Sequence, residues 1–116
     1  MVAVDANVKR RAVATANAFC RAAPVRAAYL FGSHAEGRAH EWSDVDVAVF
    51  MEGLESWKVR EETRLIVDVQ LEFGFDIEPH LFPASRLENA PRGSFAEYVL
   101  AHGIPLPLNN ASGAVE

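Results

Sequence analysis

The sequence contains a single cysteine, Cys20, among 116 residues. One cysteine cannot form a disulfide within the chain, and no Cys/His cluster has the spacing of a zinc site. Cys20 stands in the helical pattern NAFCRAA, which favours a small packed apolar side chain over a reactive thiol. The sequence therefore predicts neither a disulfide-stabilised fold nor a zinc-binding one.

Long apolar runs and an excess of positive charge are also absent. No run approaches the ~20 apolar residues that span a bilayer, and the first residues lack the apolar segment of a signal peptide. The formal net charge is −5, which argues against general nucleic-acid binding because phosphate contacts need a basic surface. The net charge does not exclude a local basic pocket for a nucleotide. We expect a cytoplasmic protein with no membrane contact.

The order of apolar patterns predicts an α/β (α+β) fold, a small mixed sheet flanked by helices. Helical spacing predicts helices over residues 5–22, 56–73 and 94–103, and alternation predicts strands over 25–31, 44–50 and 75–82. Pro79 indicates that the last of these strands lies at a sheet edge or is irregular. The length fits one domain, which we place at residues 1–106, with 107–116 as a flexible tail.

Serines are expected at several helix starts. Ser33 is expected to cap a short helix over residues 34–38 that Gly37 closes or interrupts, and Ser56 to cap the long helix after it. Ser85 is a candidate cap for another short helix before the last one.

Two aspartates, Asp44 and Asp46, stand at alternate positions of the apolar strand DVDVAVF. Their side chains therefore share one face of the strand, roughly 6–7 Å apart. Two carboxylates at that distance raise each other's pKa unless a cation lies between them, and hard divalent cations take oxygen ligands. The pair favours a Mg²⁺ site for a phosphate-bearing ligand, and the alternative is two solvated aspartates on an edge strand.

The pair Gly32-Ser33 follows the first predicted strand and precedes the short helix. A glycine there permits close approach to the backbone, and the start of a helix offers N–H groups and a hydroxyl to phosphate oxygens. The alternative is an ordinary strand-to-helix turn.

Gly32-Ser33, ten further residues, and then Asp44-Val45-Asp46-Val47 together resemble the signature of the DNA polymerase β-like nucleotidyltransferase superfamily. The chain looks in particular like the minimal nucleotidyltransferases, with Gly37 and the ending AHGIPL also in the family's places. The resemblance extends from the first predicted helix to about residue 106.

The resemblance implies roles for seven residues. In the family the Gly-Ser turn holds the triphosphate of a nucleotide, so Gly32 and Ser33 are expected to bind phosphate. Three acidic residues bind two Mg²⁺ ions in the family, and Asp44 and Asp46 are expected to supply two of them. Glu78 is the preferred third carboxylate because of its distance from ASRL, and Asp76 is the alternative. Arg38 is the nearest cation that could contact phosphate, unless it is a solvated loop arginine.

Three further residues bear on the expected nucleotide site. His80 shares the predicted strand face of Glu78 and either borders the site or packs elsewhere. Trp42 either stacks on a base or serves as a core or lid aromatic. Glu36 stands where a basic residue is frequent in the family, and an acid there is unfavourable beside a triphosphate.

The function implied by the resemblance is Mg²⁺-dependent transfer of a nucleoside monophosphate, AMP from ATP, to a hydroxyl. Relatives of this size pair with a helical HEPN-type toxin and act as its antitoxin, so we expect a tyrosine of such a partner as the acceptor. The alternatives are a non-catalytic nucleotide-binding antitoxin module and, lower, nucleotidylation of a small molecule. A homo-oligomer could also supply an acceptor cleft.

Overall fold

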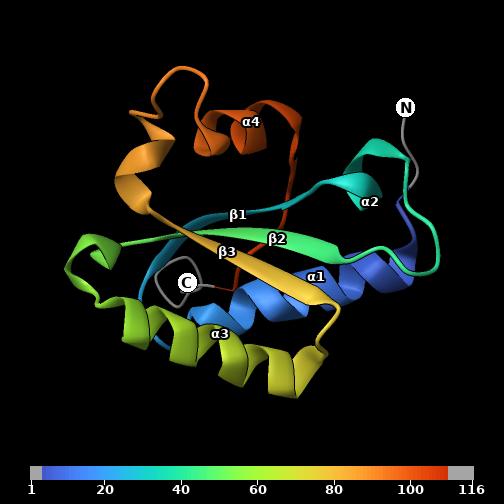
Figure 1. The fold of residues 1–116 in the computed structure, drawn as a ribbon, viewed down its shortest axis with the longest axis horizontal. Helices are drawn as coiled ribbons and strands as arrows, with labels where there is room; N and C mark the ends of the chain where they lie inside the picture. Colours follow the sequence, from blue (N-terminus) through green and yellow to red (C-terminus); the bar gives the residue numbers. More distant parts are fainter. Residues whose placement is uncertain (1–3, 110–116) are drawn as a thin grey trace.

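A computed structural model describes residues 4–109 of the chain (Figure 1). The sheet has four strands in the order β3-β2-β1-β4, with α1 and α3 on one face and α4 on the other. The elements, in chain order, are α1 (Ala6–Phe19), β1 (Val25–Phe31), α2 (Ser33–Glu36), β2 (Val45–Met51), the 3₁₀ turn η1 (Leu54–Ser56), α3 (Val59–Phe73), β3 (Ile77–Pro83), the 3₁₀ turn η2 (Ala84–Leu87), α4 (Phe95–His102) and β4 (Ile104–Pro105).

The sheet is mixed, as the sequence predicted. Strand β1 runs antiparallel to both β2 and β4, whereas β2 and β3 are parallel. A parallel pair needs a crossover connection, and α3 supplies it by packing across the sheet between β2 and β3 (Figure 1). The result is an edge strand β3 whose residues lie directly opposite those of β2.

Strand β2 is buried on both faces of the sheet. Val45, Val47 and Val49 belong to the larger core cluster with residues of α1 and α3. Ala48 and Phe50 belong to the smaller cluster with residues of α4. Asp46 stands on the same side as Ala48 and Phe50 because strand side chains alternate. The α4 face of the sheet therefore carries the acidic residue.

Most predicted elements are confirmed, but three expected helix caps are wrong. Pro83, and not Ser85, precedes the 3₁₀ turn η2. Gly32, and not Ser33, occupies the cap position of α2, and Ser33 is the first helical residue. Helix α3 begins at Val59 because the backbone is still extended at Trp57 and Lys58, and Glu61 then accepts a hydrogen bond from the Lys58 amide at 2.7 Å. Ser56 lies instead in the 3₁₀ turn η1.

The last residues of the predicted domain form a short strand that no pattern in the sequence indicated. Ile104 and Pro105 form β4 against β1, and the Leu106 amide donates to the Ala28 carbonyl at 2.8 Å. Two residues are too few for alternation to reveal a strand. Residues 110–116, most of the predicted flexible tail, lie outside the described part of the chain.

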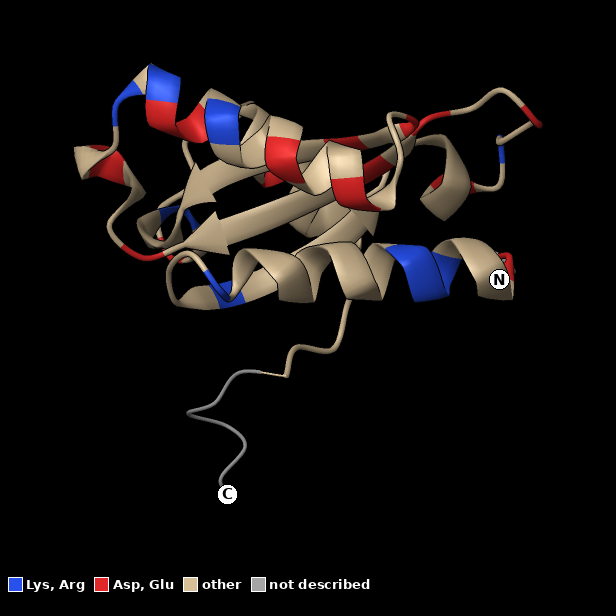
Figure 2. Ribbon diagram, turned by 90° about the horizontal axis from the view of Figure 1, so that it is seen from below, with Lys and Arg blue, Asp and Glu red and all other residues tan. Residues whose placement is uncertain are grey.

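Basic and acidic residues alternate along α3 (Figure 2). On α3, Arg60 and Arg64 stand among Glu61, Glu62, Asp68 and Glu72. Arg21 pairs with Glu72 and Arg26 with Glu52, each at 2.8 Å. Among residues 4–109, no helix is long and apolar enough to cross a membrane.

An ion pair fixes the turn that leads into β3. The Arg11 guanidinium on α1 donates to both carboxylate oxygens of Asp76, at 2.9 and 2.7 Å, and to the Phe73 carbonyl at 2.9 Å. Gly74 lies between them at a φ of +120°, where a Cβ would stand 2.7 Å from Asp76 Oδ1. The pair joins α1 to the end of α3, and so positions the first residue of β3.

This ion pair predicts a pH-dependent contribution to stability. The hydrogen bonds from Arg11 lower the pKa of Asp76, so the carboxylate stabilises the fold above its unfolded pKa of ~3.9 and loses that effect as the pH falls through the folded value. The Asp76 side chain is 48% exposed, so solvent screening limits the effect to about 1 kcal/mol or less. We expect Asp76→Asn to lower the free energy of unfolding in urea at pH 7.

The difference between Asp76→Asn and the wild type should shrink as the pH is lowered from 5 toward 3. A matched control is Glu72→Gln, which removes a carboxylate from the more exposed pair with Arg21 and should change the unfolding free energy less. A difference that stays constant over this pH range would contradict the assignment.

Candidate functional site

The candidate site lies at the end of β1 and the start of β2, where three residues stand in one row across the sheet. Phe31 of β1 is the register partner of Asp46 of β2, and Asp46 is in turn the partner of Glu78 of β3. Gly32 follows Phe31 directly, so the chain turns into α2 beside the Asp46 side chain. The strand register thus places the Gly-Ser turn, Asp46 and Glu78 together.

Glycine is the residue type that the backbone at position 32 requires. Its φ is +80°, and a Cβ at this position would stand 2.4 Å from Asp46 Oδ2, closer than any carbon and oxygen can approach. Glycine alone removes both obstacles. The Asp46 carboxylate is therefore packed directly against the backbone of the turn.

The turn exposes the first amides of α2 next to this carboxylate. The Gly32 carbonyl accepts hydrogen bonds from the amides of Ala35 and Glu36, at 3.1 and 3.0 Å. Gly37 closes the helix in the left-handed conformation, at a φ of +76°. The amides of Ser33 and His34 lie in the first turn of α2, where the helix itself supplies no acceptor for them.

The side chains of Asp46, Glu78 and His80 form a cluster. His80 Nε2 lies 3.3 Å from Asp46 Oδ1 and 3.4 Å from Glu78 Oε1. The three residues each offer one ligand atom, and these atoms all lie within 4.8 Å of one another. The arrangement is compatible with a metal ion.

The Asp46 carboxylate changes the protonation equilibrium of Glu78. A hydrogen bond shared with Asp46 raises the pKa of Glu78, and partial burial and the charge of Asp46 raise it further. Like charges at this separation disfavour double ionisation unless a cation intervenes. The pair therefore has the electrostatic character of a cation site.

Asp44 stands apart from this cluster in the structure. It is exposed and immediately precedes β2, which begins at Val45. Its charge is still close enough to contribute to the raised pKa of Glu78. The predicted role of Asp44 as a metal ligand stays a prediction.

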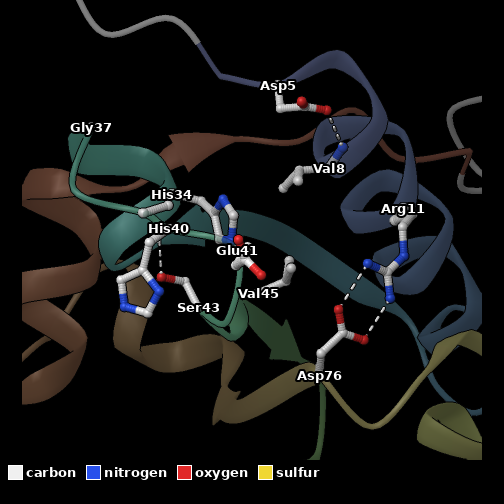
Figure 3. Close-up of a pocket in the computed structure, with 11 residues that line it drawn as sticks. Asp5, Val8, Arg11, His34, Gly37, His40, Glu41, Ser43, Val45 and Asp76 are labelled. Carbon is white, nitrogen blue, oxygen red and sulfur yellow. Dashed lines mark hydrogen bonds and ion pairs between the residues drawn. The ribbon is translucent and has the colours of Figure 1, made fainter.

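Asp76 does not join the carboxylates of Asp46 and Glu78. It lies in the turn before β3, where Arg11 lowers its pKa by hydrogen bonding. Asp76 instead lines an open pocket of about 550 Å³ on the α1 side of the sheet, together with Arg11, His34 and Val45 (Figure 3). Between the two candidates for the third carboxylate, only Glu78 faces Asp46.

Glu36, the unfavourable acid beside the Gly-Ser turn, is held by two side chains. The Tyr98 hydroxyl on α4 donates a hydrogen bond to Glu36 Oε2 and lowers the pKa of this carboxyl, and Arg38 Nη2 lies 3.3 Å from Oε1. Arg38 is therefore engaged with Glu36 in the structure. Sequence reasoning missed Tyr98, since nothing in the helical pattern of α4 relates it to residue 36.

An aromatic cluster forms the wall of the site on the α4 side. The His80 ring packs edge-on against Phe31 and Phe95, with centroid distances of 5.0 and 5.4 Å. Phe95 is 48% exposed at the start of α4. Trp42, in contrast, is 81% exposed in the loop before β2, so it is not a core residue.

Comparison with known proteins places this site in a family. Residues 14–102, well over half of the chain, match the family described as nucleotidyltransferase domain. The chain therefore belongs to the nucleotidyltransferase domain family, of the DNA polymerase β-like type. No curated protein matches the sequence.

The fold is also similar to a solved structure from Sulfolobus solfataricus, provisionally titled a nucleotidyltransferase. The TM-score is 0.58 with 16% sequence identity, over 71% of this chain and 72% of that one. At that identity the likeness concerns the fold alone.

The contact between Gly32 and Asp46 predicts a selective effect of a glycine substitution. Gly32→Ala should displace the Asp46 carboxylate and abolish cation binding at the site, measured by titration with Mn²⁺. The matched control is Gly93→Ala, because Gly93 has a φ of +78° but open space around its Cα. Both variants should lose stability from backbone strain, Gly32→Ala more, because its φ of +80° and ψ of −153° are accessible almost only to glycine. Only Gly32→Ala should lose the cation. Equal cation affinity in the two variants would contradict the packing of Asp46 on the turn.

Proposed function

We propose that the protein transfers a nucleoside monophosphate from a nucleoside triphosphate, AMP from ATP, to a hydroxyl acceptor. The observation that carries the proposal is the row formed by the Gly32 turn, Asp46 and Glu78. It brings backbone amides suited to phosphate beside carboxylates suited to divalent cations. Membership of the nucleotidyltransferase domain family supports the reaction class.

In this proposal Asp44, Asp46 and Glu78 hold two Mg²⁺ ions. Carboxylate oxygens are the ligands that Mg²⁺ takes in proteins, usually together with substrate phosphates. The donor set fits, because the raised pKa of Glu78 reflects repulsion that a cation would relieve. When bound, the ions lower the pKa of the attacking hydroxyl and neutralise charge on the triphosphate.

The chain's own residues would bind and orient the nucleotide. In this proposal the backbone amides of Gly32, Ser33 and His34 donate hydrogen bonds to the phosphate oxygens. Arg38, if it leaves Glu36, supplies a positive charge on the same side. Most of the rate enhancement then comes from positioning and charge neutralisation, as is general for phosphoryl transfer.

The acceptor that we propose is a tyrosine of a helical HEPN-type toxin, with this protein as the antitoxin. Residues 4–109 form one sheet with its covering helices and include no second lobe that could hold an acceptor. The support comes from the resemblance to minimal nucleotidyltransferases, which implies such a partner.

The third carboxylate can be identified by a pair of matched substitutions. With α-labelled ATP and Mg²⁺, Glu78→Gln should lower kcat by about 100-fold or more, because it removes a charge from the cation site. Asp76→Asn should change kcat less than about threefold, because Asp76 faces Arg11 and not Asp46. The opposite ranking would move the third carboxylate to Asp76.

The proposed partner is tested with the protein encoded by the reading frame next to the one for this protein. We expect the label from ATP to appear on a tyrosine of that protein, and to be absent with Asp46→Asn. Labelling that persists in Asp46→Asn, or no labelled acceptor with an active wild-type enzyme, would contradict this part of the proposal.

A second candidate is a non-catalytic nucleotide-binding antitoxin module. The specific observation behind it is that Asp44 is exposed and outside the cluster of Asp46, Glu78 and His80. Calorimetry with Mg-ATP separates the two functions. Binding without pyrophosphate release, in the presence of the partner, would favour the module over the enzyme.

A further inference from the structure

We infer that His80 supplies an imidazole ligand to the cation site, and that the site consequently prefers Mn²⁺ to Mg²⁺. This inference rests on the proposed function, because it concerns the same cation site. It adds a nitrogen donor to a set that would otherwise contain oxygen alone.

The strand register brings the imidazole to the carboxylates. His80 stands two residues after Glu78 on β3, so both side chains point to the α4 face of the sheet. The residue opposite His80 on β2 is Ala48, whose methyl group leaves room for the ring to lean toward Asp46. One nitrogen, Nε2, then faces both Asp46 Oδ1 at 3.3 Å and Glu78 Oε1 at 3.4 Å.

Two aromatic side chains hold the ring in this orientation. Phe31 and Phe95 pack against it edge-on, at interplanar angles of 67° and 81°. The His80 side chain is 26% exposed, so its nitrogen is accessible while most of the ring is covered. A ligand that is oriented before the ion arrives costs little conformational entropy on binding.

The distances also suit ligands of one shared ion. Nε2 lies within hydrogen-bond distance of Asp46 Oδ1, at 3.3 Å, and at 3.4 Å from Glu78 Oε1. Two ligand atoms that each lie about 2.1 Å from one metal are roughly 3.0–3.4 Å apart in octahedral or tetrahedral geometry. His80 Nε2 thus stands where a third ligand would stand.

An imidazole changes the preference among divalent ions. Carboxylates bind Mg²⁺ and Mn²⁺, whereas imidazole favours transition metals over Mg²⁺. Mn²⁺ is the transition ion that carboxylate-rich sites also accept. A mixed nitrogen and oxygen set is therefore expected to bind Mn²⁺ more tightly than Mg²⁺.

The inference is tested with Mn²⁺ alone, without nucleotide, on the full chain. Pulsed electron paramagnetic resonance of bound Mn²⁺ should show coupling to a ¹⁴N nucleus in the wild type, and this coupling should vanish in His80→Gln. Mn²⁺ affinity should fall about tenfold in His80→Gln, while Mg²⁺ affinity, measured by competition, should change less than about threefold. The matched control is His102→Gln, which removes a histidine from the far end of α4 and should leave both affinities unchanged.

Several results would overturn the inference. Wild-type protein that binds no Mn²⁺, or binds it without ¹⁴N coupling, excludes His80 as a ligand and needs no variant. Equal losses of Mn²⁺ and Mg²⁺ affinity in His80→Gln would make His80 a packing residue of the site. Because these readouts use no nucleotide, absence of transferase activity with the ¹⁴N coupling intact would refute the proposed function and leave this inference standing.

Discussion

The site depends on one close packing constraint, the contact between the Asp46 carboxylate and the backbone of Gly32. A side chain at position 32 would have a strained backbone at a φ of +80°, and its Cβ, 2.4 Å from Asp46 Oδ2, would displace the carboxylate. The turn at Gly32 and the strand β2 are therefore in direct contact. A cation bound by Asp46 would lie next to whatever anion the turn holds, and this proximity is what nucleotidyl transfer requires.

Elements on both faces of the sheet position the residues around this contact. The α3 crossover makes β3 parallel to β2, which places Glu78 opposite Asp46. Arg11 on α1 holds the turn before β3 through Asp76. On the other face, Phe95 of α4 packs on His80, and Tyr98 binds Glu36 beside the turn. Of the two candidates for the third carboxylate, Glu78 lies at the candidate site, whereas Asp76 pairs with Arg11.

Much of the fold was predictable because its elements have strong periodic patterns. The strand over residues 25–31 and the edge position of β3 were predictable from alternation and from Pro79. The start of α3 and the strand β4 were not, because a short 3₁₀ turn and a two-residue strand leave no periodic signal. For the candidate site, the strand register brings Gly32, Asp46 and Glu78 together, which the family resemblance had implied, whereas Asp44 lies outside the cluster of Asp46, Glu78 and His80. The separation of Asp76 depended on an ion pair with a residue 65 positions away, which no local pattern contains.

The most direct test of the central claim is a crystal structure of the protein soaked in Mn²⁺, with the ion located by its anomalous scattering. The account predicts a peak between Asp46 and Glu78, at about 2.1–2.2 Å from a carboxylate oxygen of each. A peak in the pocket of Arg11 and Asp76, or no peak near Asp46, would contradict the assignment of this row as the cation site.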